Sequence, residues 1–217
     1  MRLLADRRRA ATQDETESLG RPLPRDFYDR PATVVARALL GRVLVRDATE
    51  GRVAGLIVEV EAYRGAADPA SHAYRGPTRR NAVMFGAPGH AYVYFTYGMH
   101  HCLNLVTGRE GVASAVLVRA LEPRIGIDSM RRRRGVETLE RLARGPGCVA
   151  QALGLDLADN GLDVTRPPLW VSDRLPERSG PIAASTRIGI RVATERPWRF
   201  FLRGSRFVSG PGGGLRR

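Results

Sequence analysis

Two glutamates stand close together in the segment VEVEAYRGAADPASHAYRG, residues 58–76. Alternate residues of a strand point to the same side of a sheet, so Glu59, Glu61 and Tyr63 are predicted to share one face. A carboxylate held at the mouth of a pocket can serve as a general base. The alternative is that both glutamates lie on an edge strand whose outer face is solvated.

Arg119 interrupts the otherwise apolar segment AVLVRAL, residues 115–121. A guanidinium in such a strand is costly unless a carboxylate pairs with it. Two partners are possible, Glu61 and Glu122. Pairing with Glu61 would keep that carboxylate ionised at neutral pH and fix its orientation.

Aromatic residues alternate in PGHAYVYFTYGMHHCLNL, residues 88–105. Tyr92 and Tyr94 are predicted to share a strand face, which is typical of core or cross-strand pairs. Tyr97 precedes Gly98 at a predicted hairpin turn, where there is no core to fill. An exposed aromatic at this point could insert between stacked bases, where stacking is worth ~1–3 kcal/mol.

The charge of the chain points to a polyanionic partner. Its formal net charge is +13, and all 35 basic residues are arginine. Such a surface attracts nucleic acids, although the arginine bias is equally expected of a GC-rich genome. Because the chain has no lysine, only the N-terminal amine could form a Schiff base, so no lysine-dependent lyase step is expected.

Several other classes of protein do not fit the sequence. No apolar run is close to the length of about 20 residues that is needed to span a bilayer. The N-terminal segment MRLLADRRRAATQDETESLG lacks the apolar core that a signal peptide has. Cys102 and Cys148 have no zinc-site spacing and are expected to be reduced, buried thiols. We therefore expect a cytoplasmic protein that interacts with no membrane.

The elements that must position these residues follow from periodicity. Helical spacing predicts helices over residues 32–40, 127–134, 137–143 and from 147 to 153. Strand patterns cover residues 42–46, 53–62, 91–96, 102–107, 115–121, 169–172, 186–192 and 200–203. Residues 63–81 are predicted to form a loop.

These patterns predict a single α+β domain. Its core is a mixed, mostly antiparallel, barrel-like sheet with surrounding helices and a protruding hairpin over residues 91–107. Residues 1–22 are interpreted as a flexible leader, residues 23–209 as the domain, and residues 210–217 as a flexible Gly-rich tail.

From residue 25 to 209, the chain resembles the alkyladenine (3-methyladenine) DNA glycosylase family, the single-domain purine glycosylases that are distinct from the helix-hairpin-helix enzymes. The longest matching segment is EVEAYRGAADPASHAYRGPTRRNAVMFGAPGHAYVYFTYGMHHCLN, residues 59–104. Shorter matches are LLGRVLV at 39–45, AVLVRALEP at 115–123, GPGCVAQALG at 145–154 and FFLRGSRFVS at 200–209.

The resemblance implies a role for each residue that matches the family's motifs. Glu61 would be the catalytic residue, and Arg119 would orient it and a water molecule. The extruded base would lie between three side chains: Tyr63, His72 and Tyr94. Tyr97 would intercalate into the duplex, and Asn104 would screen guanine-type bases. Family members need no metal and no cofactor.

The sequence thus predicts a monofunctional glycosylase, without lyase activity, that acts as a monomer on duplex DNA containing alkylated or deaminated purines. It would flip 3-methyladenine and related bases out and hydrolyse the N-glycosidic bond, which initiates base excision repair. Its expected location is the bacterial cytoplasm, on the nucleoid. The alternatives are a non-catalytic nucleic-acid-binding module and an N-glycosidase that acts on RNA or nucleosides. No role is assigned to residues 1–22, 155–185 and 210–217.

Overall fold

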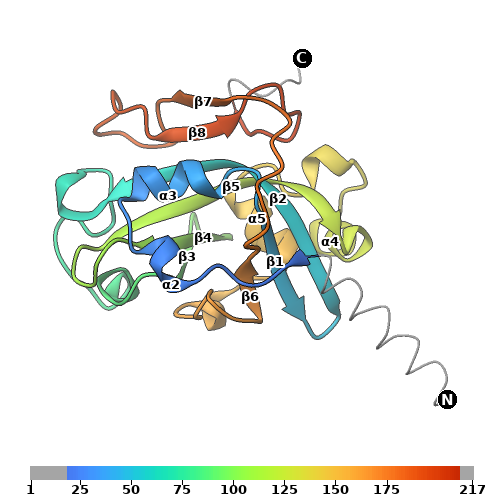
Figure 1. Ribbon diagram of the computed structural model, residues 1–217, viewed down its shortest axis with the longest axis horizontal. Helices are drawn as coiled ribbons and strands as arrows, with labels where there is room; N and C mark the ends of the chain where they lie inside the picture. Colours follow the sequence, from blue (N-terminus) through green and yellow to red (C-terminus); the bar gives the residue numbers. More distant parts are fainter. Residues whose placement is uncertain (1–18, 211–217) are drawn as a thin grey trace.

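A long central strand, β2 (Gly51–Arg64), organises the sheet. The computed structural model describes residues 19–210 and is shown in Figure 1. Strand β5 (Ser114–Ile125) pairs with β2 from Ala54 to Arg64. The other edge of β2 is shared by β1 (Val43–Ala48) near its start and β8 (Arg199–Leu202) near its end. The part of β2 that carries Glu59 and Glu61 is therefore paired on both edges.

The remaining strands extend this sheet. They are β3 (Ala91–Thr96), β4 (His100–Thr107), β6 (Leu169–Val171) and β7 (Ile182–Ser185). The strand order is β3-β4-β5-β2-β1-β6, and β7 pairs with β8. All seven strand pairs within residues 19–210 are antiparallel. Register shifts beside Glu59 bend and twist β2 against β5.

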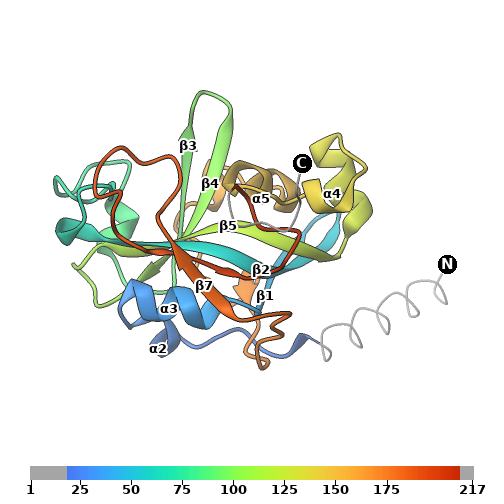
Figure 2. The same cartoon turned by 90° about the horizontal axis from the view of Figure 1, so that it is seen from above.

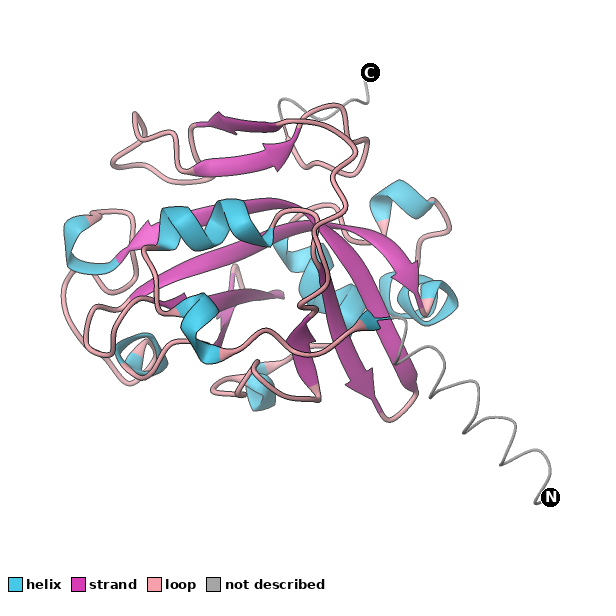
Figure 3. Cartoon of the chain, in the orientation of Figure 1, coloured by secondary structure: helices cyan, strands magenta, loops and turns pink. Residues whose placement is uncertain are grey.

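Short helices surround the sheet, as Figure 3 shows. The α-helices are α2 (Arg25–Tyr28), α3 (Ala32–Leu39), α4 (Ile127–Arg134) and α5 (Pro146–Leu153). The 3-10 helices are η1 (Gly65–Ala67), η2 (Ala82–Phe85), η3 (Leu139–Arg141) and η4 (Leu157–Asp159). The predicted α+β domain with a curled antiparallel sheet is confirmed.

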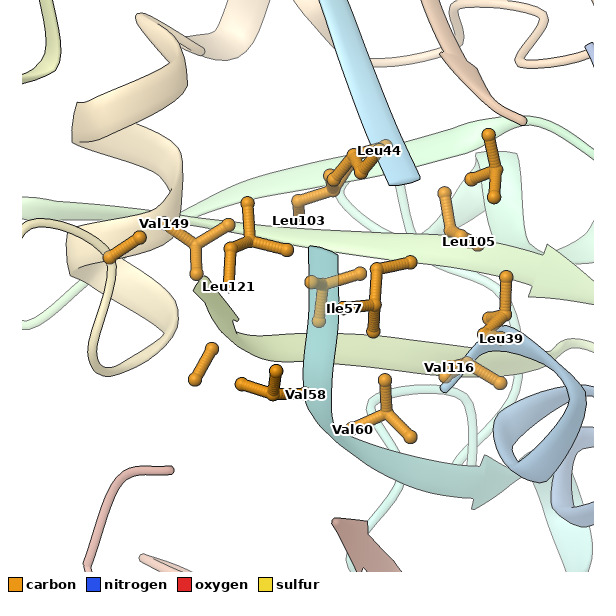
Figure 4. Packing of buried hydrophobic residues seen from close by; sticks show 14 of the residues in the cluster. Leu39, Leu44, Ile57, Val58, Val60, Leu103, Leu105, Val116, Leu121 and Val149 are labelled. Carbon is orange, nitrogen blue, oxygen red and sulfur yellow. The ribbon is translucent and has the colours of Figure 1, made fainter. Parts of the chain in front are cut away.

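The main core lies between α3, α5 and the strands. Helix α3 buries residues at positions i, i+3, i+4 and i+7, which is the spacing of one helix face: Ala32, Val35, Ala36 and Leu39. Figure 4 shows Leu39 of α3 beside Val60 of β2 and Val116 of β5. Alternation along β2 places Val60 in this core, so Glu61 and Tyr63 must face the other side of the sheet.

The β3–β4 hairpin projects from the body of the protein, as Figure 2 shows. Its strand β4 is held by α5, which packs on β4 and β5. The approach is close even at the residue that follows the turn: a Cβ added at Gly147 of α5 would lie 2.9 Å from Cγ of His100. The expected protruding hairpin over residues 91–107 is therefore present, and helix α5 supports its strand β4.

Two predicted elements are wrong. Residues 137–143 form only the 3-10 turn η3, because the backbone that follows bonds to β5 at Leu121 and Arg119. Residues 186–192 form no strand. Gly189 within the segment and Ala193 directly after it have φ values of +79° and +50°, which an extended strand does not accommodate. The strand β7 lies just before this segment and was missed.

The domain begins earlier than predicted. Residues 1–18 of the predicted leader and 211–217 of the predicted tail lie outside the described residues. Leu19, however, is buried against Val45 and Trp170, and Pro22 forms a β-bridge with Ser172. Residues 19–22 therefore pack on the domain and do not form a flexible leader.

Two further observations concern the whole described chain. Within residues 19–210, the helices are too short or too polar to cross a membrane. Cys102 and Cys148 are both free thiols, but only Cys102 is buried and Cys148 is half-buried. The expectation of two buried thiols is thus correct for Cys102 alone.

Candidate active site

A cavity of about 540 Å³ opens beside the β3–β4 hairpin. Its size falls within the range of small-molecule sites, about 300–1,000 Å³. Six of the seven residues singled out from the sequence line it: Tyr63, His72, Tyr94, Tyr97, Asn104 and Arg119. The seventh, Glu61, has no exposed surface, and it lies directly behind the wall because its hydrogen-bond donors belong to the lining.

Three donors hold the carboxylate of Glu61. Its Oε1 accepts a hydrogen bond from the Ile188 backbone N–H at 2.8 Å and lies 3.1 Å from Nη1 of Arg119. Its Oε2 accepts from the hydroxyl of Tyr63 at 2.8 Å. An ionised carboxylate has about four lone-pair positions. One position on Oε2 therefore accepts no bond from the residues that the structure describes.

The second carboxylate, Glu59, is also completely buried. Both glutamates lie inside the sheet, so the alternative of a solvated edge strand is wrong. Arg119 reaches across both carboxylates, with Nε 3.1 Å from Oε1 of Glu59. Glu122 pairs instead with Arg124. The sequence left Glu61 and Glu122 as possible partners of Arg119. In the structure, Arg119 pairs with Glu61 and also with Glu59.

The charges around Arg119 keep it ionised. Burial by itself lowers the pKa of Arg119, but the carboxylates of Glu61 and Glu59 outweigh burial and raise the pKa above its ordinary value. Because the guanidinium stays charged, its contacts with the two carboxylates are charge-assisted.

Tyr63 forms part of the cavity wall and is braced from behind. Burial, followed by the negative charge of Glu61, raises the pKa of Tyr63 well above its ordinary value. The phenol is therefore neutral and able to donate its proton to Glu61. The guanidinium of Arg187 lies 4.6 Å from the centre of the Tyr63 ring. Arg187 is itself held by Asp68 in a fully buried ion pair.

His72 and Tyr94 form an adjoining wall. Their rings meet edge to face, with centroids 4.6 Å apart, and Nδ1 of His72 lies 3.0 Å from the hydroxyl of Tyr92. Partial burial, reinforced by the positive charge of Arg80, lowers the pKa of His72. The imidazole is therefore neutral at neutral pH.

Asn104 also faces the cavity. It lies opposite Tyr92 in the β3–β4 pair, and its side-chain amide donates to the Tyr92 carbonyl at 3.2 Å. This bond fixes the orientation of the amide group. Asn104 thus presents a fixed polar group to anything that enters the cavity.

The hairpin turn places an aromatic side chain in solvent. Tyr97 is 82 % exposed, and the neighbouring Met99 is 70 % exposed. The backbone of Tyr97 is left-handed, with φ of +52°. A non-glycine residue pays about 1–2 kcal/mol for that conformation. This exposed, strained aromatic therefore takes no part in the core of the protein.

Sequence reasoning missed the residues that support the site from the C-terminal segment. Arg199 of β8 donates to Oε1 of Glu59 at 2.6 Å, and the Ser209 N–H donates to Oε2 at 2.6 Å. Residues 188–192, predicted as a strand, are an irregular segment that lines the cavity. The match FFLRGSRFVS at 200–209 was the only signal that this region belongs to the site.

Comparison with known proteins gives a consistent result. A family model described as methylpurine-DNA glycosylase matches residues 26–206. A protein from Rhodopseudomonas palustris is 52 % identical over 89 % of this chain and 93 % of its own length. Similar proteins from Burkholderia lata and Methanoculleus marisnigri are 51 % and 53 % identical, over 88 % and 86 % of this chain and 93 % and 98 % of their own lengths. All three carry the provisional name 3-methyladenine DNA glycosylase.

Proposed function

The chain belongs to the methylpurine-DNA glycosylase family, and from this premise we propose that it excises 3-methyladenine and related alkylated or deaminated purines from duplex DNA. The family membership makes it a DNA glycosylase. The proposal concerns how it acts: the damaged nucleotide is flipped into the cavity, and water activated by Glu61 cleaves its N-glycosidic bond. It acts as a monomer, on DNA in the cytoplasm.

The observation that carries this mechanism is the buried, triply bonded carboxylate of Glu61 behind an aromatic cavity. An ion without exposed surface is costly unless it is fully paired. Its donors, Arg119, Tyr63 and the Ile188 N–H, fix its position while leaving one position on Oε2 for water. Such a preorganised carboxylate is suited to accept a proton and to stabilise nearby positive charge.

The chemical step follows from these groups. An alkylated purine carries positive charge, so the base is already a good leaving group. As the bond from C1′ to the base nitrogen breaks, its electron pair goes to the base, and the sugar acquires oxocarbenium character. Water attacks C1′ and transfers a proton to Glu61. The products are the free base and an abasic site, and no lysine exists for subsequent strand cleavage.

The cavity walls supply selection for damaged bases. The rings of Tyr63, His72 and Tyr94 favour a flat, electron-poor base through stacking and cation–π attraction. Because His72 is neutral, it does not repel a cationic purine. We propose that the fixed amide of Asn104 crowds the exocyclic amine of guanine-type bases. Extrusion costs least at damaged pairs, which adds to the selection.

In the proposed complex, Tyr97 occupies the gap left in the duplex. Its side chain is exposed at the tip of a hairpin whose strand β4 packs on α5, so insertion breaks almost no internal contact. Stacking on a neighbouring base stabilises the flipped state by ~1–3 kcal/mol. The arginine-rich surface contacts phosphates without reading sequence.

Product analysis tests the proposed function. Incubation with methylated duplex DNA should release free 3-methyladenine, and strand breaks should appear only after alkali treatment. Methylated RNA and free nucleosides, tested in parallel, should be poor substrates because neither offers a stacked duplex for Tyr97. Binding without base release would instead favour a non-catalytic module, and preference for RNA or nucleosides would favour the other N-glycosidase class.

A further inference from the structure

A second buried carboxylate, Glu59, stands next to the site without touching the cavity. It has no exposed surface and does not contribute to the lining. Three groups donate hydrogen bonds to its carboxylate: Nε of Arg119 in β5, Nε of Arg199 in β8, and the backbone N–H of Ser209 after β8. The mechanism above gives Glu59 no chemistry, although burying a carboxylate here is as costly as burying Glu61.

The hydrogen bonds of Glu59 define how Arg119 lies. Nε of Arg119 donates to Oε1 of Glu59 at 3.1 Å, and Nη2 lies 3.4 Å from Oγ of Ser209. Only Nη1 is directed at Glu61. An arginine with a single carboxylate partner tends to form a two-bond fork with it. Glu59 engages Nε, and Ser209 engages Nη2, so neither nitrogen forms a second bond to Glu61.

Glu59 also balances charge. Glu59 and Glu61 face two guanidiniums, those of Arg119 and Arg199, so the buried cluster is neutral. Without the charge of Glu59, the cluster would carry a net positive charge. Positive charge close to the reacting sugar opposes the oxocarbenium character of the transition state.

We propose that Glu59 is a positioning residue of the glycosylase: it holds Arg119 side-on, so that one N–H reaches Glu61, and it cancels the charge of Arg199. This proposal rests on the role proposed for Glu61. Glu59 itself touches neither base nor sugar. Its effect is therefore on the rate of bond cleavage and not on the binding of DNA.

The test compares Glu59→Gln with the wild type in two measurements on the full chain. Single-turnover release of 3-methyladenine from duplex DNA should slow at least about tenfold. The Kd for a duplex with a tetrahydrofuran abasic-site analogue should stay within about twofold of the wild type. Asp159→Asn is the matched control, because Asp159 is a buried carboxylate that pairs with Arg46 at 2.7 Å, away from the cavity. This control should change neither value.

A double variant separates positioning from mere structure. Glu59→Gln combined with Arg199→Gln restores a neutral cluster, so it should recover part of the rate that Glu59→Gln loses. If Glu59→Gln alone does not fold, the double variant can be measured in its place. A rate for Glu59→Gln within about twofold of the wild type would overturn the proposal. The proposal would also be overturned if the double variant released 3-methyladenine more slowly than the wild type and bound the abasic duplex more weakly.

The same assays distinguish this proposal from the proposed function. If the wild type does not release 3-methyladenine, the proposed function fails, and the role of Glu59 fails with it. If the wild type is active, Glu61→Gln is inactive and Glu59→Gln is fully active, only the role of Glu59 is wrong.

Discussion

Replacing Tyr97 with glycine should have opposite consequences for the free protein and for its complex with damaged DNA. The Tyr97 side chain is 82 % exposed, so the folded protein loses almost no buried contact. Its φ of +52° is unfavourable for tyrosine and natural for glycine. The same side chain is the proposed wedge in the duplex.

The magnitudes can be estimated separately. Relief of the left-handed strain gains about 1–2 kcal/mol, while the greater freedom of glycine in the unfolded chain costs about 0.5–1 kcal/mol. The free energy of unfolding should therefore stay the same or rise, by at most about 1.5 kcal/mol. Loss of base stacking costs ~1–3 kcal/mol, which is roughly a five- to 150-fold rise in Kd.

The assay pairs a urea unfolding curve with titration of a duplex that contains an abasic-site analogue. Tyr97→Phe is the matched control, because it keeps the ring and should bind like the wild type. The role of Tyr97 is refuted if Tyr97→Gly binds the abasic duplex as tightly as the wild type. A loss of several kcal/mol in unfolding free energy would instead show that Tyr97 supports the fold.

Three further predictions test the cavity. Arg119→Met should lower the free energy of unfolding by about 3–5 kcal/mol in urea denaturation, because it leaves Glu59 and Glu61 short of a counter-ion; an unchanged midpoint would contradict that coupling. Burial and Arg80 hold the pKa of His72 below its ordinary value, so protonation favours the unfolded chain and stability falls as the pH drops below about 6.5. His72→Phe should therefore lose less unfolding free energy than the wild type between about pH 8 and about pH 5, and an equal loss would count against this assignment. Arg191 is exposed on the cavity lining, so Arg191→Gln should reduce the slope of log K for DNA binding against log salt concentration by about one. The control Arg37→Gln, on α3, should leave this slope unchanged. Equal slopes for Arg191→Gln and the wild type would show that Arg191 does not contact DNA phosphates.

Much of the sheet was predictable because its strands follow simple alternation. The two strands that carry Glu61 and Arg119 were located correctly, since polar residues in otherwise apolar strands stand out in the sequence. The hairpin was equally clear from its alternating aromatics and its Tyr97–Gly98 turn. In each case local pattern and final pairing agree.

The errors arose where distant contacts decide the structure. Ile188, Ile190 and Val192 alternate like a strand, but they line the cavity instead of pairing in the sheet. Strand β7 has the weak pattern IAAS and depends on pairing with β8. The partners of Glu59 could not be found from spacing, because Arg199 and Ser209 lie about 140–150 residues away along the chain.

The most direct test of the central claim is single-turnover excision by Glu61→Gln. The amide keeps the size of the side chain but cannot take up a proton from water. Base release should fall by at least about 100-fold, while the Kd for the abasic-site duplex remains close to that of the wild type. Release of 3-methyladenine at a rate near that of the wild type would contradict the assignment of Glu61 as the group that activates water.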